Sequence, residues 1–564
     1  MDANDPSASN IPVSSRISRR RVLATAGGAA VAGGAAVAGG AAVAAVLLPS
    51  RLNQRNTEAC PGARNATTAN EVPTPAVTDP GGGLPLPSTL AADASPQFRA
   101  VAEALTGSMR KHRVPGTALG ILADDREEHA TFGVASMNTL LPVGPNTLFQ
   151  IGSLTKTYTA TTIWRLIDEG KLALDAPVRT YIPDLRLQDE ATAARVTVGD
   201  LMDHSAGWYG DEGTYTGEGD DGIARYVAER LPQLPQLFPL GKFFSYNNAA
   251  FTLLGHLIEV ASGTIYNTAM QNLLLGPLGL TETVLDRREV LQRSYSDGHY
   301  AGPINGKDSV AVQSPLWVPR SADPAGGIWS TTRDVMRYAR IHLAADTGGG
   351  TGGIVSAQSL RQMQNPAKPV PGLNMSIGRN WFVQDVGGVR GFMHDGDTVG
   401  QHTVFLAIPQ RQFAFVLFVN NLFSGSAVEL EVLDAALASY PGLAELAGKI
   451  GFTRSVVAPP DAPTVTLSEA EAADYAGRYQ DPGLVMTFVG SNGRLEATVE
   501  HLDEKNSLGD GAIGPSPPPP TSIAFLGKDM AVSQGTRVPF VRNDAGRVGW
   551  VGNAFRLVPH TAAS

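Results

Sequence analysis

Strand-like segments lie at both ends of the central part of this chain, with helix-like segments between them. Residues 117–136 read as two strands around a polar turn, and four more strand-like runs separated by turn residues lie between 376 and 421. Between Ser153 and Arg340 the pattern is mostly helical, with Gly/Pro loops. Strands far apart in sequence need one another to form a core. The sequence therefore predicts an α+β fold: one antiparallel sheet built from both ends, flanked by helices, with a mostly helical domain inserted.

The composition of the chain changes on either side of this region, and we predict five segments. Residues 1–48 have the character of an export signal or membrane anchor. Residues 49–95 are rich in Pro, Ala, Thr and Gly and read as a disordered linker. The main domain is expected over 96–450, beginning with one helix and ending with another. A second linker over 451–465 precedes a β-rich accessory domain over 466–564, expected to be a small barrel or sandwich.

The first segment contains SRRRVLA at 18–24, followed by three copies of GGAAVA at 27–44. A twin-arginine pair before a weakly apolar Gly/Ala run resembles a Tat export signal, so the Tat machinery is an expected partner. Cleavage could follow Ala44, or residues 22–48 could stay as an uncut anchor, the one membrane contact that we expect. A chance basic cluster before a low-complexity tract is the alternative. The lipoprotein reading of Cys60 is disfavoured because TEAC lacks the required apolar residue. The protein is expected in the periplasm, cell envelope or medium.

Charge and cysteine content exclude several classes of function. The formal net charge is -9, and no long basic stripe lies outside the N-terminus, so nucleic acid is not an expected partner. The single cysteine cannot form an internal disulfide, and no Cys/His cluster has zinc spacing. We therefore predict no metal and no cofactor. The expected partner is a small-molecule or peptide substrate.

The pattern S-x-x-K occurs twice, at Ser108/Lys111 and at Ser153/Lys156. Ser108 lies in the last turn of a predicted helix, where Lys111 belongs to a basic C-terminus that complements the helix dipole. Ser153 instead opens a predicted helix that ends near Gly170. There Lys156 is one turn away on the same face, and free N–H groups point towards a developing oxyanion. An ordinary N-cap serine explains Ser153 equally well on this stretch alone.

Two later motifs complete an ordered set. Tyr246-Asn247-Asn248 stands just before a buried helix, and His394-Asp395-Gly396 lies on a predicted strand near the end of the sheet region. S-x-x-K, Y-x-N and [K/H]-x-G in this order resemble the serine β-lactamase and penicillin-recognising family, and the flanking phrases resemble its class C branch, which also holds DD-peptidases and esterases. The resemblance covers about residues 96–445. It implies a β-lactamase/transpeptidase-like fold and an acyl-enzyme reaction.

The resemblance also implies roles for particular residues. Ser153 would be the nucleophile, with Lys156 and Tyr246 sharing the proton transfer; which of the two is the base stays open. Asn248 would orient Lys156 or hold the substrate amide, with a helix N-cap as the alternative. The backbone N–H groups of Ser153 and Asp397 would form the oxyanion hole.

The third motif departs from the family's K-T-G form. His394 replaces the lysine, Asp395 replaces a small or hydroxyl residue, and Gly396 is kept. A rim with less positive charge should bind a substrate carboxylate poorly, so we expect ester, amide or peptide substrates, D-amino acid or cell-wall compounds included, rather than β-lactams. A true β-lactamase or DD-carboxypeptidase, and a non-catalytic penicillin- or peptide-binding protein, are the alternatives. Metal ligation by His394, Asp395 and Asp397 is disfavoured because no further ligands converge.

Three residues near the motifs are assigned less specific roles. His204 lies in a phrase shared with the family, and we interpret it as structural, holding a loop near the site. Trp208 and Tyr209 are expected either to line the pocket or to belong to the core.

Overall fold

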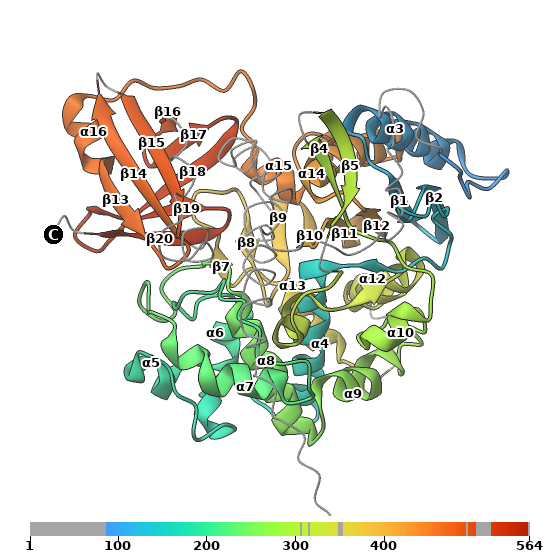
Figure 1. Cartoon of the computed structure of the whole chain (residues 1–564), viewed down its shortest axis with the longest axis horizontal. Coiled ribbons are helices and arrows are strands. Elements are labelled where there is room, and N and C mark those ends of the chain that lie inside the picture. The colour runs from blue at the N-terminus through green and yellow to red at the C-terminus, as the bar shows by residue number, and fades with distance from the viewer. Residues whose placement is uncertain are drawn as a thin grey trace, which may run out of the picture.

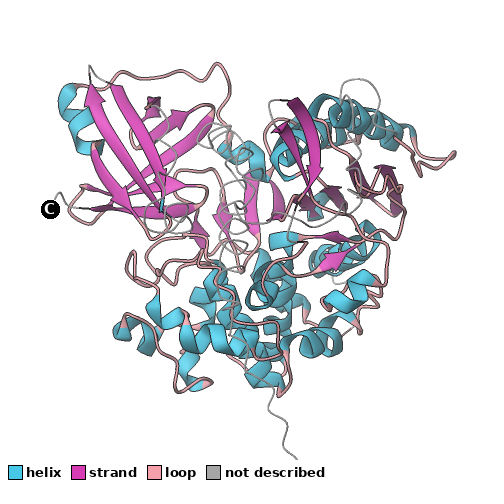
Figure 2. Ribbon diagram, in the orientation of Figure 1, coloured by secondary structure: helices cyan, strands magenta, loops and turns pink. Residues whose placement is uncertain are grey.

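The computed structural model describes residues 86–304, 307–313, 316–347, 353–491, 494–502 and 520–561. Within these ranges the molecule has an antiparallel sheet between two helical layers, and a β-barrel beside it at the C-terminal end (Figures 1 and 2). The predicted signal (1–48), most of the predicted linker (49–95) and Cys60 lie outside the described residues.

The large sheet joins strands from both ends of the main domain. In the part of the chain that the structure describes, its strand order is β2-β1-β12-β11-β10-β9-β8-β7, and every neighbouring pair is antiparallel. β1, from the N-terminal end, pairs with β12, from the C-terminal end, so the predicted α+β architecture is confirmed. The strands span β1 Gly116–Ala123, β2 Arg126–Gly133, β7 Lys368–Pro369, β8 Ser376–Ile377, β9 Phe382–Val386, β10 Val389–Thr398, β11 Gln401–Ile408 and β12 Phe413–Val419.

Helices cover both faces of this sheet. On one face α3 (Pro96–His112) and α14 (Leu422–Ser439) pack against each other and over the strands, burying apolar side chains such as Leu105 and Val428. On the other face α12 (Thr332–Thr347) contacts β1, β11 and β12. Two apolar cores result, one on each side of the sheet.

The inserted domain is mostly helical, as predicted, and lies below the sheet in Figure 1. Its longest helices, α4 and α8, pack together, and their contact residues are almost all buried. The elements of this domain, with the helices that follow it, are α4 Thr155–Asp168, α5 Glu190–Arg195, α6 Val198–Met202, α7 Gly222–Glu229, α8 Asn248–Ser262, α9 Tyr266–Met270, the π-helical turn η4 Gln271–Leu275, α10 Arg287–Leu291, α11 Asp323–Gly326 and α13 Ala357–Gln364.

The structure differs from the sequence prediction in three places. A hairpin of β4 (His299–Ile304) and β5 (Lys307–Val312) interrupts the region read as helical. The run read as one strand over 376–386 is divided into β8 and β9, because Asn380 adopts a left-handed φ of 79°. Helix α14 begins at Leu422, four residues before Ser426, where the sequence pattern predicts its start, since the Asn421 side chain caps it by accepting the Ser424 N–H.

The C-terminal part of the chain forms a barrel with a core of its own. Helix α16 (Glu469–Tyr475) starts with a capping box between Ser468 and Glu471 and precedes the first strand. Among the described residues the barrel closes by pairing β13 with β20. Its strands are β13 Gly477–Gln480, β14 Leu484–Ser491, β15 Arg494–His501, β16 Thr521–Gly527, β17 Met530–Ser533, β18 Thr536–Arg542, β19 Val548–Asn553 and β20 Arg556–Thr561.

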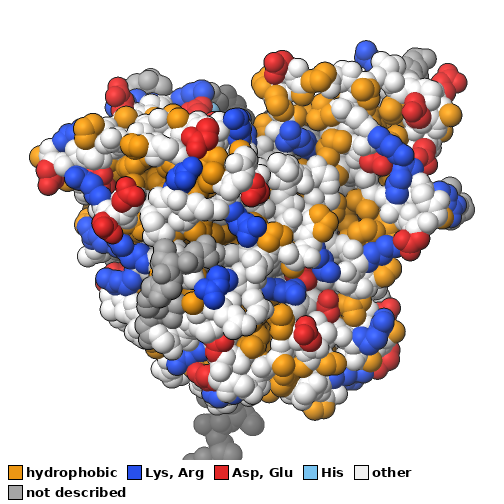
Figure 3. All heavy atoms as spheres, turned by 180° about the vertical axis from the view of Figure 1, so that it is seen from behind, with side chains coloured by type: hydrophobic (Ala, Val, Ile, Leu, Met, Phe, Trp, Pro, Cys, Tyr) orange, Lys and Arg blue, Asp and Glu red, His pale blue; other side chains and the backbone are white. Residues whose placement is uncertain are grey.

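The connection to the barrel, predicted as a linker over 451–465, holds helix α15 (Phe452–Val456) and pairs with barrel residues at Val457 and Val465. On the face of the molecule drawn in Figure 3, basic and acidic side chains are interspersed over both parts. In the described residues no single helix is long and apolar enough to cross a bilayer; the bent pair of α8 with α9–η4 passes by length and composition.

Candidate active site

Ser153 lies in a short 3₁₀ turn, η1 (Gly152–Leu154), that runs directly into helix α4. Its side chain caps neither η1 nor α4, so the N-cap alternative does not describe it. Lys156, in the first turn of α4, places Nζ 3.0 Å from Ser153 Oγ. The serine and the lysine of this S-x-x-K motif are therefore in direct contact through the hydroxyl and the amine.

Lys156 is completely buried. Its amine also donates to the backbone oxygen of Ala325 at 2.6 Å and lies 4.9 Å from the centroid of the Tyr246 ring. Burial, followed by the positive charge of Arg556, holds the pKa of Lys156 well below its usual value. A lowered pKa favours the neutral amine, which is the form that can accept a proton from Ser153.

Tyr246 lies on the other side of this amine. Its hydroxyl is buried and makes no hydrogen bond to the described residues, yet the Ser153 hydroxyl is near enough to favour the phenolate. Burial outweighs that influence and raises the pKa of Tyr246 far above its usual value. The His204 ring stacks on Tyr246 at 4.4 Å, and the Arg556 guanidinium lies 4.7 Å from the Tyr246 ring centroid. Ser153, Lys156 and Tyr246 thus meet at one point, as their motifs predict.

The second motif also holds the start of helix α8. Asn247, not Asn248, is the N-cap: its side chain accepts the N–H of Ala250 at 2.8 Å. Asn248 Nδ2 donates to Asp211 Oδ1 at 2.7 Å, and the residue lines the pocket in front of Ser153. The N-cap alternative for Asn248 is therefore wrong. Asp211 holds the Asn248 amide group in place. A contact of Asn248 with the substrate amide, or one that orients Lys156, stays a prediction.

Two glycines allow strand β10 to approach the nucleophile turn. Gly152 has a left-handed φ of 52°, and a Cβ there would lie 2.9 Å from the backbone nitrogen of Asp397. A Cβ on Gly396 would lie 2.9 Å from the nitrogen of Ser153 and 2.0 Å from the oxygen of Ile151. Such approach is possible only without side chains. The backbones that carry the two predicted oxyanion-hole donors, Ser153 and Asp397, therefore lie side by side.

His394 occupies the place where the family's motif has a lysine. The ring is buried; Nδ1–H donates to the backbone oxygen of Asp395 at 2.5 Å, and Nε2 has no hydrogen-bond partner in the described chain. Burial and then the Lys156 amine lower the pKa of His394 to about 3. His394 is consequently neutral at physiological pH and offers no fixed cation to a substrate.

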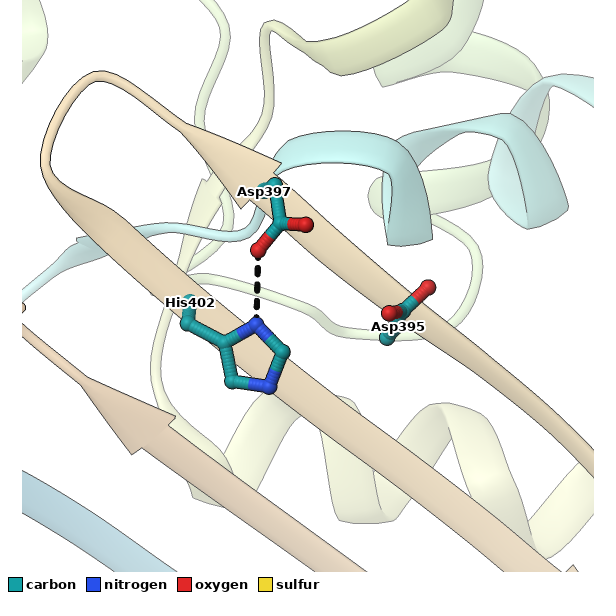
Figure 4. Close-up of side chains that lie close together, drawn as sticks. All are labelled: Asp395, Asp397 and His402. Atoms are coloured by element: carbon teal, nitrogen blue, oxygen red, sulfur yellow. Dashed lines mark hydrogen bonds and ion pairs between the residues drawn. The ribbon is translucent and has the colours of Figure 1, made fainter. Parts of the chain in front are cut away.

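Asp395 and Asp397 face a buried histidine, His402, that the sequence analysis did not identify (Figure 4). His402 Nδ1 donates to Asp397 Oδ1 at 2.6 Å, and its Nε2 lies 3.5 Å from Glu429 Oε2. Although burial opposes the charge, these two carboxylates raise the pKa of His402 to about 10. Burial and the neighbouring Asp397 raise the pKa of Asp395 well above its usual value.

One ligand atom from each of Asp395, Asp397 and His402 lies within 4.8 Å of the others, a spacing that could hold a metal ion. This trio differs from the one weighed in the sequence, because His394 is not in it. His402, with its raised pKa, is the cation that faces Asp397, and the raised pKa of Asp395 favours its neutral acid form. We interpret the group as a buried ion-pair cluster that supports β10 from the α14 side.

The other S-x-x-K copy has a structural environment. Ser108 Oγ donates to Glu431 at 2.6 Å, His112 lies 3.0 Å from the same carboxylate, and Lys111 pairs with it as well. Glu431 belongs to α14, so the cluster fastens α3 to α14. The Ser108 hydroxyl therefore donates its hydrogen bond to a carboxylate, whereas the Ser153 hydroxyl contacts a lysine amine.

The remaining predicted residues are also placed. His204 Nδ1 accepts the N–H of Asn247 at 3.0 Å, and Nε2–H donates to Asn380 at 3.1 Å, so it links a loop to the second motif and to the sheet. Trp208 is buried in the core, and Tyr209 packs against that core. Neither lines the described pocket around Ser153.

Arg556 and Asp211 were missed by the sequence analysis, although both line this pocket. They form an ion pair across 345 residues of sequence, with Nε–Oδ2 at 2.7 Å and Nη2–Oδ1 at 3.0 Å. No local pattern indicates such a pair.

An antiparallel sheet with an inserted helical domain, and a serine beside a buried lysine and tyrosine, define the class of serine hydrolases that use an S-x-x-K nucleophile. A family model described as Beta-lactamase matches residues 101–439, and the chain belongs to this family. It is 31% identical over 387 residues to penicillin-binding protein 4 of Amycolatopsis lactamdurans (66% of this chain, 95% of that protein), and 32% identical over 262 residues to a beta-lactamase of Lysobacter lactamgenus (46% and 62%).

Solved structures show the same fold. The structure of SurE superposes with a TM-score of 0.65 at 24% identity, covering 82% of this chain and 99% of that one. A D-amino acid amidase from Ochrobactrum anthropi SV3, complexed with D-phenylalanine, gives a TM-score of 0.52 at 22% identity, covering 61% and 99%.

Proposed function

We propose that the protein is an exported acyl hydrolase that forms an acyl-enzyme on Ser153 and acts on esters, amides or peptides in preference to β-lactams. The observation that carries the proposal is the buried Lys156 amine, 3.0 Å from Ser153 Oγ and with a depressed pKa. This geometry satisfies the requirement that a weak serine nucleophile have a base in contact.

The depressed pKa of Lys156 and the elevated pKa of Tyr246 favour a division of labour. The neutral Lys156 amine accepts the Ser153 proton as Oγ bonds to the substrate carbonyl carbon. The oxyanion is stabilised by the N–H groups of Ser153 and Asp397. Tyr246, which stays protonated, donates its proton to the leaving group as the bond to the carbonyl carbon breaks, and regains one from Lys156. Water then releases the acyl group by the reverse of these transfers.

The substrate preference rests on the neutral His394. A β-lactam carries a carboxylate that a fixed cation in the third motif would bind, and a buried imidazole with a pKa of about 3 provides no such charge. A D-amino acid amidase shares the fold, which makes D-amino acid amides a useful test substrate.

Labelling and a substrate panel test the proposal. A fluorophosphonate probe should label the wild-type protein and Ser108→Ala but not Ser153→Ala. Ser108→Ala is the matched control, because it removes the serine of the other S-x-x-K copy. Hydrolysis of p-nitrophenyl esters, D-amino acid amides and D-Ala-D-Ala peptides should exceed that of nitrocefin. Nitrocefin turnover near the diffusional ceiling, on the order of 10⁸ M⁻¹s⁻¹, would contradict the preference. Absence of both labelling and hydrolysis would favour a binding protein.

Export is proposed from the twin-arginine segment and has a separate test. Replacing the arginines at 19–21 by lysine should retain the protein in the cytoplasm, since the Tat machinery reads the arginine pair. Secretion that is unchanged by this substitution would contradict Tat export and leave the hydrolase proposal untouched.

A further inference from the structure

The C-terminal barrel reaches into the active site through one hairpin. Its strands β19 and β20 are joined at Ala554 and Phe555, which both adopt left-handed φ angles, 44° and 69°. This tip lies on the segment that carries the second motif. The Tyr246 N–H donates to the Phe555 oxygen at 2.9 Å, and the Leu557 N–H donates to Ser245 Oγ at 3.0 Å. The backbone on either side of the tip is thereby fixed to the tyrosine segment.

Arg556, the residue after the tip, continues this contact with its side chain. Its guanidinium lies 4.7 Å from the Tyr246 ring centroid and makes two hydrogen bonds to Asp211, which in turn accepts the Asn248 amide at 2.7 Å. A third bond from Arg556 reaches the Ala554 oxygen at 2.7 Å and holds the side chain against its own hairpin. One barrel residue is thus linked to both named members of Y-x-N.

The charge of Arg556 acts on a desolvated site. Lys156 Nζ and the Arg556 guanidinium approach the same Tyr246 ring, at 4.9 and 4.7 Å. The positive charge of Arg556 disfavours protonation of the Lys156 amine. The other titratable groups around Lys156 and Tyr246 are Asp211, Asp395, His204 and His394. The two histidines are neutral, and Asp211 is paired with Arg556.

We propose that Arg556 is a positioning residue of the hydrolase site, which holds Tyr246 and Asn248 in place and favours the neutral form of Lys156, so that the barrel is part of the catalytic unit. The inference rests on the proposed acyl-enzyme function. It assigns the barrel a role in the reaction beyond that of an attached module.

The test compares Arg556→Gln with Arg556→Lys and with Arg537→Gln in the full chain. Arg537 is the matched control, since it also joins the barrel to the rest of the chain, through the oxygens of Ser455 and Val457, but is not among the residues that line the pocket in front of Ser153. With a neutral p-nitrophenyl ester, Arg556→Gln should lower kcat about 30-fold with little change in KM, the equivalent of a desolvated cation–π contact of about 2 kcal/mol.

A pH profile separates positioning from mere structural support. Without the positive charge Lys156 holds its proton more tightly, so the acid limb of kcat/KM for Arg556→Gln should move up by about one pH unit. Arg556→Lys keeps a charge and should restore the wild-type limb. Arg556→Gln/Asp211→Asn removes both charges and should return the limb towards wild type while kcat stays low.

Three results would overturn the inference. The first is an unchanged kcat and pH profile in Arg556→Gln. The second is an effect confined to the KM of carboxylate-bearing substrates, which would make Arg556 a substrate ligand. The third is an equal loss in Arg537→Gln, which would make the effect one of domain attachment. Should Arg556→Gln fail to fold, the pH limb of Arg556→Lys decides alone, and a shifted limb there counts against the inference. In each of these cases the proposed function is still supported if the wild-type protein hydrolyses the ester and Ser153→Ala does not.

Discussion

The buried ion pair behind strand β10 makes a prediction about stability that depends on pH. His402 is fully buried, donates to Asp397 at 2.6 Å and lies 3.5 Å from Glu429, and these carboxylates raise its pKa to about 10. The perturbation is His402→Asn, which keeps a donor but cannot carry charge.

The magnitude follows from proton linkage. A rise in pKa from 6.5 to about 10 corresponds to about 5 kcal/mol, since each tenfold change in proton affinity is worth about 1.36 kcal/mol. Because the folded-state pKa lies above the unfolded value, the contribution is fully present below pH 6.5 and is lost as pH rises towards 10. Removing one partner of a buried ion pair costs about 3–5 kcal/mol of stability in other proteins, which agrees with the figure from proton linkage. The free energy of unfolding of the wild type should therefore exceed that of His402→Asn by about 3–5 kcal/mol at pH 6.5 and by little at pH 10.

Urea unfolding followed by tryptophan fluorescence at several pH values between 6.5 and 10 measures this difference. The control is His342→Asn. His342 is equally buried, but it packs against aromatic rings and burial lowers its pKa to about 3. The difference in free energy of unfolding between wild type and His342→Asn should therefore be constant over the same pH range. A constant difference for His402→Asn would refute the ionised pair.

Two further substitutions test the proposed catalytic machinery. Lys156→Met should reduce acylation by on the order of 10²–10⁴-fold, measured by stopped-flow with an ester. The free energy of unfolding should not decrease, because a desolvated amine is replaced by an apolar chain of similar length; marked destabilisation would show that Lys156 is a structural cation. Gly396→Ala places a Cβ 2.0 Å from the Ile151 oxygen and should push β10 away from η1. Loss of an oxyanion donor predicts a fall in kcat of about 10²–10³-fold, and an unchanged kcat would contradict the assignment of Asp397.

The sheet was predictable from sequence because its strands carry local signals. β11 and β12 are buried throughout and contain β-branched and aromatic residues, and the turn between β1 and β2 is polar. The division of β8 from β9 was not predictable. It depends on the left-handed Asn380, whose side chain accepts a hydrogen bond from His204, 176 residues away in the inserted helical domain.

The proposed catalytic trio was predictable for a different reason. Ser153 and Lys156 are one helical turn apart, so sequence spacing alone brings them together. Tyr246 was identified through motif order. Arg556 has no such signal, because its partner is an aspartate 345 residues away. His402 lies five residues from Asp397 across the β10–β11 hairpin, but its second carboxylate, Glu429, comes from α14. The pair of Arg556 with Asp211 and the contact of His402 with Glu429 are made by tertiary contacts and leave no trace in local sequence.

Alternation along β10 explains how one strand serves two electrostatic purposes. Successive side chains of a strand point to opposite faces. Asp395 and Asp397 share the face of His402, which the register places opposite Asp397, while His394 and Gly396 share the other. One face of the strand therefore carries the pair of Asp397 with His402, although both aspartates also line the pocket in front of Ser153, while the other face carries the neutral imidazole of His394. A shift of one residue would exchange the faces and turn Asp397 away from His402, so that the buried imidazolium would lose the carboxylate that it faces.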